Sequence, residues 1–351
     1  MINKPNIRSL SLEELIKVFV DKGEKEYRAK QVYEWLWKKN VRNFDEMTNL
    51  SKNLRKFLDE NFSIPHIQIK YFQQSLDGTI KNAVNLKDNL LVESVLIPTE
   101  SRTTACISSQ VGCSLDCKFC ATARLKNMRN LTPDEIVDQV VEADIQSRKY
   151  YQHPLSNIVF MGMGEPLLNY NNIMIAIDKI TSDKALGMSP RRITVSTSGI
   201  PKMIKKLADE NPKIKLAVSL HSAVDEIRNK IMPVNKRQGG LKELLSSLQY
   251  WYKKTKSKIT FEYLVFKNIN DDKKSIRALV EFCKKVPSKV NLIEYNPIDD
   301  TDIFIQADNK VLDIYQDKLK QAGIVSTVRR SRGQDIDAAC GQLAGKIINN
   351  S

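Results

Sequence analysis

Apolar residues in the first sixty positions recur at the three- and four-residue spacing of amphipathic helices. Leu12, Leu15, Ile16 and Phe19 fall on one stripe, and a second stripe runs through residues 28–37. We therefore expect a small helical accessory domain over residues 1–62. Its basic residues surround aromatic ones, an arrangement that suits RNA binding, although aromatic residues at helical spacing also form cores.

Residues 63–98 show the shorter period of β-strands. Asp77-Gly78 is a hairpin turn signal between residues 67–72 and 80–86, and a further strand over residues 91–97 ends at Pro98. We interpret this segment as a short β adaptor. Within it Glu93 stands among apolar neighbours, so it either faces solvent by alternation or lines a cavity with a raised pKa; alternation alone favours solvent.

Beyond residue 100 strand-like and helix-like segments alternate, which is typical of parallel βαβ units in an α/β fold. The candidate strands cover residues 103–108, 157–161, 192–196, 214–220, 259–265 and 290–295. Six units predict an open, partial (β/α)6 barrel over residues 99–335, followed by a C-terminal segment over residues 336–351. No flexible linker separates these parts, so we expect them to pack as one body.

Composition narrows the class of protein. Hydrophobic residues make up 42% and charged residues 27% of the 351 positions, which is ordinary for a globular protein. No apolar run could span a bilayer and the N-terminus lacks a signal-peptide pattern, so we expect a cytoplasmic protein. The net charge of +14 indicates a polyanionic partner. In a reducing compartment, six cysteines indicate metal binding or catalysis rather than disulfides.

Three of these cysteines form a C-x3-C-x2-C cluster at Cys113, Cys117 and Cys120. No fourth cysteine follows at the local spacing of a structural zinc site or an ordinary ferredoxin. Three thiolates on a [4Fe-4S] cluster leave one iron open to chelate a small molecule and transfer an electron to it. The alternative is a Cys3His zinc site completed by His221 or His153.

Polar residues follow five of the six candidate strands, at the end where a β/α barrel carries its active site. The cysteine cluster follows the first strand. The other four strands are followed by Gly164 with Glu165, by Ser196, by the stretch Ser219 to His221, and by Asn296. Glu165 can accept a hydrogen bond from an ammonium group, whereas His221 taken alone is equally a core histidine.

These residues and several longer motifs resemble the RlmN/Cfr family of radical S-adenosylmethionine (SAM) RNA methyltransferases along nearly the whole chain. The motifs are Tyr27 to Gln31, Val92 to Pro98, Cys106 to Cys113, Arg129 to Thr132, Met161 to Pro166, Met232 to Asn235 and Asp335 to Leu343. The resemblance implies a radical SAM barrel whose [4Fe-4S] cluster is held by Cys113, Cys117 and Cys120. It implies SAM contacts from Gly164, Glu165, Ser196, Ser219, Leu220, His221 and Asn296.

The resemblance also assigns a reaction. Cys340 takes a methyl group from one SAM, and a radical made from a second SAM activates that methyl group for addition to an adenine. Glu93 then accepts a proton, and Cys106 attacks Cys340 to form a transient disulfide that releases the RNA. The implied target is carbon 2 of an adenosine in 23S rRNA, and of a tRNA anticodon-loop adenosine. An electron donor such as flavodoxin or ferredoxin is also implied, and we expect a monomer.

Two alternatives stay open. Cfr-type enzymes use the same cysteines to methylate carbon 8, although Val92 to Pro98 and Met161 to Pro166 look more like the carbon 2 branch. A zinc-stabilised RNA-binding protein without catalysis would contain zinc, lack acid-labile sulfide and ignore SAM.

Overall fold

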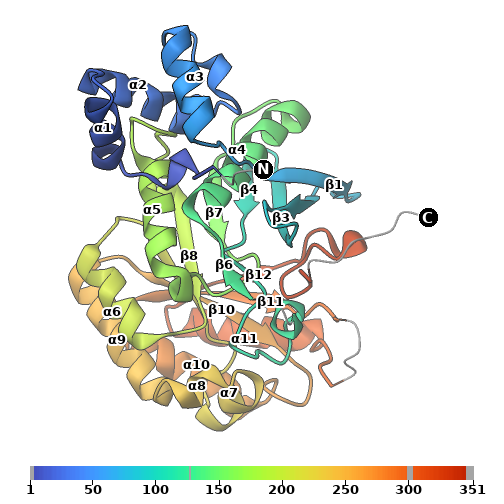
Figure 1. Cartoon of the computed structure of the whole chain (residues 1–351). Coiled ribbons are helices and arrows are strands. Elements are labelled where there is room, and N and C mark those ends of the chain that lie inside the picture. Colours follow the sequence, from blue (N-terminus) through green and yellow to red (C-terminus); the bar gives the residue numbers. More distant parts are fainter. Residues whose placement is uncertain (1–3, 126–127, 299–302, 345–351) are drawn as a thin grey trace.

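The computed structural model describes residues 4–125, 128–298 and 303–344 (Figure 1). The N-terminal part is helical as predicted: α1 (Leu12–Asp21), α2 (Glu26–Trp37) and α3 (Lys52–Asn61). Ser11 begins α1 with a capping box to Glu14. Trp37 is buried in the core, whereas Trp35 is half-buried with the Lys39 ammonium over its ring. The core interpretation is therefore correct for Trp37.

Ten strands form one continuous sheet, in the order β1-β2-β3-β4-β7-β8-β9-β10-β11-β12. The first four strands pair antiparallel and β4 onward pair parallel. The strands are β1 (Gln68–Gln74), β2 (Ile80–Asn85), β3 (Leu91–Thr99), β4 (Arg102–Cys106), β7 (Asn157–Phe160), β8 (Ile193–Thr197), β9 (Lys215–Ser219), β10 (Ile259–Val265), β11 (Ser288–Glu294) and β12 (Val325–Arg329). A separate ribbon pairs β5 (Gln110–Val111) with β6 (Arg129–Asn130).

The six predicted strands are present, and the partial barrel is confirmed. Two features go beyond the prediction. The β adaptor continues the barrel sheet through the β3–β4 pairing, and β12 adds a further parallel strand at the opposite edge.

Helices cover the outer face of the curved sheet, where α5, α6, α9 and α10 are visible in Figure 1. They are α4 (Pro133–Tyr151), α5 (Tyr170–Thr181), α6 (Pro201–Glu210), α7 (Asp225–Ile231), α8 (Val234–Arg237), α9 (Gly240–Thr255), α10 (Lys273–Lys284) and α11 (Asn309–Gln321). At the start of α4 the Thr132 N–H donates to the Glu135 carboxylate at 2.9 Å. Buried apolar residues of helices and strands form one large core that includes the N-terminal helices.

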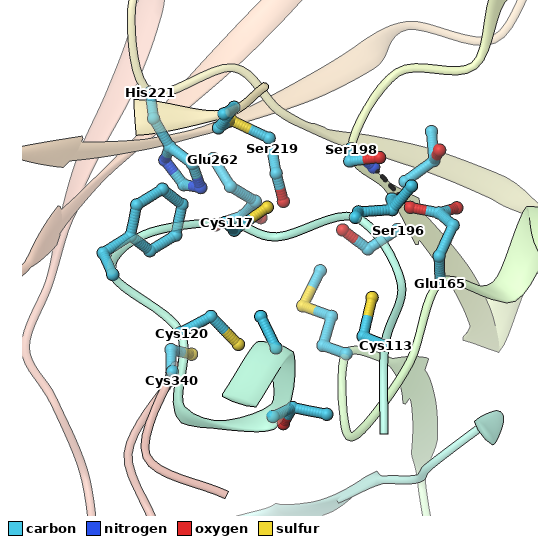
Figure 2. A pocket seen from close by; sticks show the side chains of 18 of the residues that line it. Cys113, Cys117, Cys120, Glu165, Ser196, Ser198, Ser219, His221, Glu262 and Cys340 are labelled. Carbon is cyan, nitrogen blue, oxygen red and sulfur yellow. Dashed lines mark hydrogen bonds between the residues drawn. The ribbon is translucent and has the colours of Figure 1, made fainter. Parts of the chain in front are cut away.

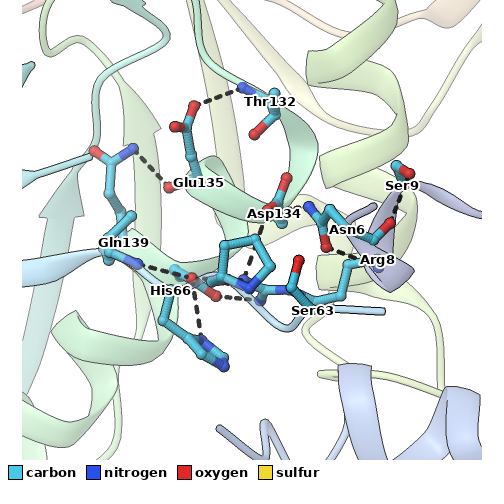
Figure 3. A network of polar contacts seen from close by, with 12 residues as sticks. Asn6, Arg8, Ser9, Ser63, His66, Thr132, Asp134, Glu135 and Gln139 are labelled. Atoms are coloured by element: carbon cyan, nitrogen blue, oxygen red, sulfur yellow. Dashed lines mark hydrogen bonds and ion pairs between the residues drawn. The ribbon is translucent and has the colours of Figure 1, made fainter. Parts of the chain in front are cut away.

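A buried polar network joins the N-terminal segment to α4 (Figure 3). The Arg8 guanidinium donates to both oxygens of Asp138, at 2.6 and 2.9 Å, and lies 3.6 Å from Asp134. Asn6 also donates to Asp134 at 2.8 Å, and His66 Nδ1 lies 3.4 Å from Asp138. These contacts fix the helical part against the barrel.

The chain ends in a segment that crosses between the two edges of the sheet, which we term the C-terminal strap (residues 330–344). The Gly333 N–H donates to Asp77 at 3.0 Å and the Leu76 N–H donates to Asp335 at 3.2 Å, so the strap is held at the β1–β2 turn. Its far end returns to the cysteine loop, where the Thr122 hydroxyl donates to the Leu343 carbonyl at 2.6 Å. The proposed domain boundaries remain predictions; their outermost residues 1–3 and 345–351 lie outside the described residues.

None of the helices in the described ranges is long and apolar enough to cross a membrane.

Candidate active site

The cysteine loop follows β4 at its carboxyl end, where Cys113, Cys117 and Cys120 line one cavity (Figure 2). Within residues 4–125, 128–298 and 303–344, no three His, Cys, Asp or Glu side chains converge closely enough to hold a single metal ion. A zinc ion needs its thiolates about 2.3 Å from one point. Three thiols that line one cavity are compatible with a larger, multi-iron body, and His153 does not line that cavity.

An apolar shell surrounds the three thiols, formed largely by Phe119, Met232, Leu264 and Phe266. Burial raises the pKa of Cys113 to about 12, and it also raises the pKa values of Cys117 and Cys120. Metal coordination deprotonates thiols outright, which would offset this cost. The site therefore suits iron–sulfur ligation better than free thiol chemistry.

After β7, Gly164 and Glu165 form the next wall of the cavity. Gly164 has φ +96°, and a Cβ there would lie 2.5 Å from the Gln110 side chain, so only glycine fits. One Glu165 oxygen accepts the Ser198 N–H at 2.8 Å and the other accepts the Leu167 N–H at 3.1 Å. Burial raises the pKa of Glu165 despite these hydrogen bonds. A ligand ammonium beside it would stabilise the ionised form.

Residues after β8 and β9 also meet the cavity, whereas the residue predicted after β11 does not. Ser196, Ser219 and His221 line it, but Leu220 and Asn296 do not. Leu220 is fully buried, and the Asn296 amide is engaged by Gln334 at 2.8 Å. His221 accepts the Leu264 N–H on Nδ1 at 3.0 Å, and burial lowers its pKa to about 3, so the ring is neutral. His221 is therefore a buried, hydrogen-bonded histidine that also lines the cavity.

Arg228 holds the loops of the site in place, although nothing in the sequence around it indicates this role. The Arg228 guanidinium is buried and donates to the carbonyls of Ser198, Leu220 and Ser219, at 2.5, 3.0 and 3.2 Å. It therefore ties the loops after β8 and β9 together. Its position three residues before Ile231 on α7 looks like an ordinary surface arginine in the sequence.

Cys340, on the C-terminal strap, reaches the same cavity, although it is far from the cluster in sequence (Figure 2). A smaller adjoining cavity is lined by both Cys340 and Cys106. Burial, followed by negative charge on Cys340, raises the pKa of Cys106 to about 12. The Arg329 guanidinium lines both cavities and acts in the opposite direction on the pKa of Cys106, lowering it. In the sequence Arg329 is one cation of a basic cluster; the structure places it at the thiols.

Glu93 is buried, at 3% exposed, so the solvent-facing interpretation is wrong. It accepts the Ala344 N–H of the strap at 2.7 Å, and Lys81 Nζ lies 3.8 Å away. Its strand neighbour Val95 lines the thiol cavity and pairs with Cys106. Glu93 thus lies close to the thiol cavity without lining it.

Comparisons with known proteins agree along the whole chain. Residues 5–64 match the profile of the Ribosomal RNA large subunit methyltransferase N-terminal domain, and residues 107–280 match that of the Radical SAM superfamily. The chain is 64% identical over 343 residues to a probable dual-specificity RNA methyltransferase RlmN of Christiangramia forsetii, covering 98% of this chain and 97% of that protein. It is 39% identical over 349 residues to the protein of the same description from Streptococcus pyogenes, covering 98% and 97%.

A solved structure has the same fold. The crystal structure of a radical SAM methyltransferase from Sphaerobacter thermophilus superimposes with a TM-score of 0.91 at 36% identity, covering 97% of this chain and 100% of that chain.

Proposed function

The chain belongs to the RlmN family of radical SAM RNA methyltransferases, and from that premise we propose that it methylates carbon 2 of an adenosine in 23S rRNA and in a tRNA anticodon loop. The relatives' description as dual-specificity RNA methyltransferases supports this proposal. The observation that carries it is the approach of Cys340 to the cavity of the three-cysteine loop. A thiol there can hold a methyl group beside the radical source.

Cys113, Cys117 and Cys120 would hold the [4Fe-4S] cluster, and Gly164, Glu165, Ser196, Ser219 and His221 would contact SAM. When bound, these groups supply a reducing electron and a radical that removes hydrogen from a methyl group. The Glu165 carboxylate would accept the SAM ammonium, and the apolar shell around Phe119 would exclude water. For Leu220 and Asn296 the proposed contact is indirect, because neither lines the cavity.

Cys340 is suited to carry the methyl group because it is the exposed cysteine among the six, all of which the structure describes. Its neighbours Ala339 and Gly341 are small, and the Arg329 guanidinium lines the same two cavities. As a thiolate, Cys340 would attack the methyl carbon of one SAM, forming a carbon–sulfur bond and releasing S-adenosylhomocysteine. A second SAM is then needed per turnover, since that methyl group must be activated by a radical.

Cys106 would release the product by attacking Cys340, leaving a disulfide between the two thiols of one cavity. Before that, Glu93 would accept the proton lost from the substituted carbon. The strap N–H of Ala344 that now holds Glu93 would have to yield for this to happen.

The target explains why a radical route is needed. Adenine carbon 2 has no lone pair with which to attack SAM, so polar methyl transfer fails there. The base must also leave its stack, which costs least in single-stranded loops. We further propose a cytoplasmic monomer that takes electrons from a flavodoxin- or ferredoxin-like donor.

The deciding experiment is an anaerobic assay of cluster-reconstituted protein with methyl-labelled SAM, reductant and unmodified 23S rRNA fragment, read by nucleoside mass spectrometry. We expect 2-methyladenosine. An 8-methyladenosine product would assign the chain to the Cfr-type reaction. A colourless zinc protein that ignores SAM would instead support the non-catalytic alternative.

Cys340→Ala tests the methyl-carrier role directly. We expect RNA methylation to fall below detection, because no thiol accepts the methyl group, while iron content and SAM binding persist. Cys283→Ala is the matched control, because Cys283 is a buried cysteine of α10 away from the cavities described here. Methylation by Cys340→Ala at the control rate would contradict the proposal.

A further inference from the structure

The inner face of the parallel strands is ordered in layers. Alternate residues of a strand point to the same face, and neighbouring strands lie about 4.8 Å apart. Near the carboxyl ends of the strands, which we call the upper end of the barrel, the cavity of the cluster loop and the thiol cavity are lined by inward residues. These include Cys106, Met161, Ser196, Ser219 and Glu262. Two positions earlier on β4 and β8 they are Thr104 and Thr194. The barrel interior is thus polar along its length, unlike the branched apolar filling usual in closed barrels.

The lowest layer is basic. Arg102, Arg192, Lys215 and Lys289 stand at or beside the first positions of β4, β8, β9 and β11, and their side chains are exposed. None forms an ion pair with a carboxylate in the described ranges, whereas Arg330 nearby pairs with Glu294. We term these four residues the basic mouth. Glu262, farther inside the same cavity, is the carboxylate with which Lys289 interacts electrostatically. Four cations around one opening exceed this single acidic group and form a site for an anion.

A cavity of about 400 Å³ leads from the basic mouth to Cys340. It shares part of its wall with the cavity of the cluster loop: Met161, Glu262, Ile293, Arg329 and Cys340. Cys340 can therefore be reached from two sides. The cluster loop, Glu165 and the serines occupy the upper side, so the lower side is left for a second reactant.

The shared wall also presents a polar atom that lacks a partner. Glu262 is buried, and one of its oxygens accepts the Asn291 amide at 2.9 Å, but the other has no hydrogen bond within the described structure. A buried oxygen without a hydrogen-bond partner loses the hydration that it has in water, which is unfavourable. A polar guest in the barrel interior would satisfy it.

We propose that RNA approaches through the amino-terminal end of the barrel, with phosphates flanking the target nucleotide held by the basic mouth and the base inserted upward to Cys340. This proposal rests on the proposed function and adds the direction from which the substrate enters. Arg192 and Lys215 lie on adjacent strands, and Lys289 lies two strands further, so the cations are spaced along an arc that a backbone can follow.

The test compares two charge-matched variants. The mouth variant carries Arg102→Gln, Arg192→Gln, Lys215→Gln and Lys289→Gln. The control carries Lys242→Gln, Lys253→Gln, Lys273→Gln and Lys274→Gln, exposed lysines of the outer helices α9 and α10. Both proteins keep the cluster loop, and iron content and SAM binding verify that each is folded.

The probe is an unmodified anticodon stem-loop RNA with an adenosine beside the anticodon, and its affinity is measured as a function of salt. We expect the mouth variant to bind about 10- to 100-fold more weakly and its salt slope to fall by about 3, because each single-strand phosphate contact contributes about 0.7. The control should change by less than about threefold.

Equal losses in both variants, or no loss in the mouth variant, would overturn the proposal. The proposed function is judged separately by methylation of the same RNA by the wild-type protein. If wild-type protein binds this RNA but does not methylate it, the tRNA part of the proposed function fails, whereas the comparison of variants still decides where RNA binds.

Discussion

Two thiols that share one cavity differ in how readily they can react. Cys340 is exposed on the strap, whereas Cys106 is buried at the end of β4 with a pKa raised to about 12. At neutral pH Cys106 is therefore a protonated, poor nucleophile. This difference would let Cys340 accept a methyl group without premature attack by its neighbour, and Arg329 limits the cost when Cys106 must finally ionise.

Cys106→Ala should separate methyl addition from product release. RNA should stay covalently attached to Cys340, because no thiol remains to displace it. Denaturing electrophoresis would detect the adduct, and nuclease digestion would leave a modified adenosine on the peptide of Cys340. Cys283→Ala should give no adduct. Free methylated RNA released by Cys106→Ala at the normal rate would refute the resolving role.

The three-cysteine loop and Glu165 were predicted from local motifs whose chemistry can be read from the residues themselves. The role of Cys340 was predicted only through the family resemblance, because spacing alone gives no signal for it. Arg228 and Arg329 could not be assigned in this way, since their roles arise from loops and strands brought together only by folding. The solvent-facing prediction for Glu93 was wrong because it, too, depended on a contact formed only in the folded chain. Alternation predicts one solvent-facing side, but the strap covers that position.

At the scale of elements, the join between the N-terminal helices and α4 depends on buried charge. Burial disfavours ionised Asp138, but hydrogen bonds from His66 and Arg8 outweigh it and lower the pKa of Asp138. Its contribution to stability is therefore fully present above about pH 4, the range of the unfolded pKa, and is lost as the pH falls through the lower folded pKa.

Arg8→Met should destabilise the fold by about 3–5 kcal/mol at pH 7, because it leaves Asp138 buried without its strongest partner. Urea unfolding measures this loss. The difference from wild type should shrink below the folded pKa, where Asp138 is neutral. Arg148→Met, which removes an exposed ion pair with Asp144, should cost less than about 1 kcal/mol. Equal costs for both variants would contradict the role of the network.

Helix caps and strand periods predicted most elements, but not β12. Its sequence Val-Ser-Thr-Val-Arg is short and only partly buried, so it carries no clear hydrophobic period. Pairing with β11 is what makes it a strand. The union of adaptor and barrel in one sheet was also beyond prediction, because the β3–β4 register is a long-range pairing that no local pattern encodes.

At the scale of the whole molecule, the fold decides where the excess positive charge is concentrated, which composition alone does not show. The excess of +14 indicates a polyanion but not where it binds. The basic mouth appears only when residues from four separate strands are brought to one end of the barrel. Outer-surface lysines then contribute to solubility and general attraction rather than to positioning.

The strap crosses from β12 to the β1–β2 turn and places Cys340 beside Cys106. A disulfide between them would close a loop of more than 200 residues. The lost entropy would raise the free energy of the unfolded chain by about 5–6 kcal/mol in the chain-entropy estimate. Oxidised protein should therefore melt at a higher temperature than reduced protein in scanning calorimetry, and Cys106→Ala should lose this difference. A lower melting temperature for the oxidised wild type, relative to oxidised Cys106→Ala, would count against it. The melting temperature would then distinguish molecules that have formed the disulfide at the end of a turnover from molecules that have been reduced for the next one.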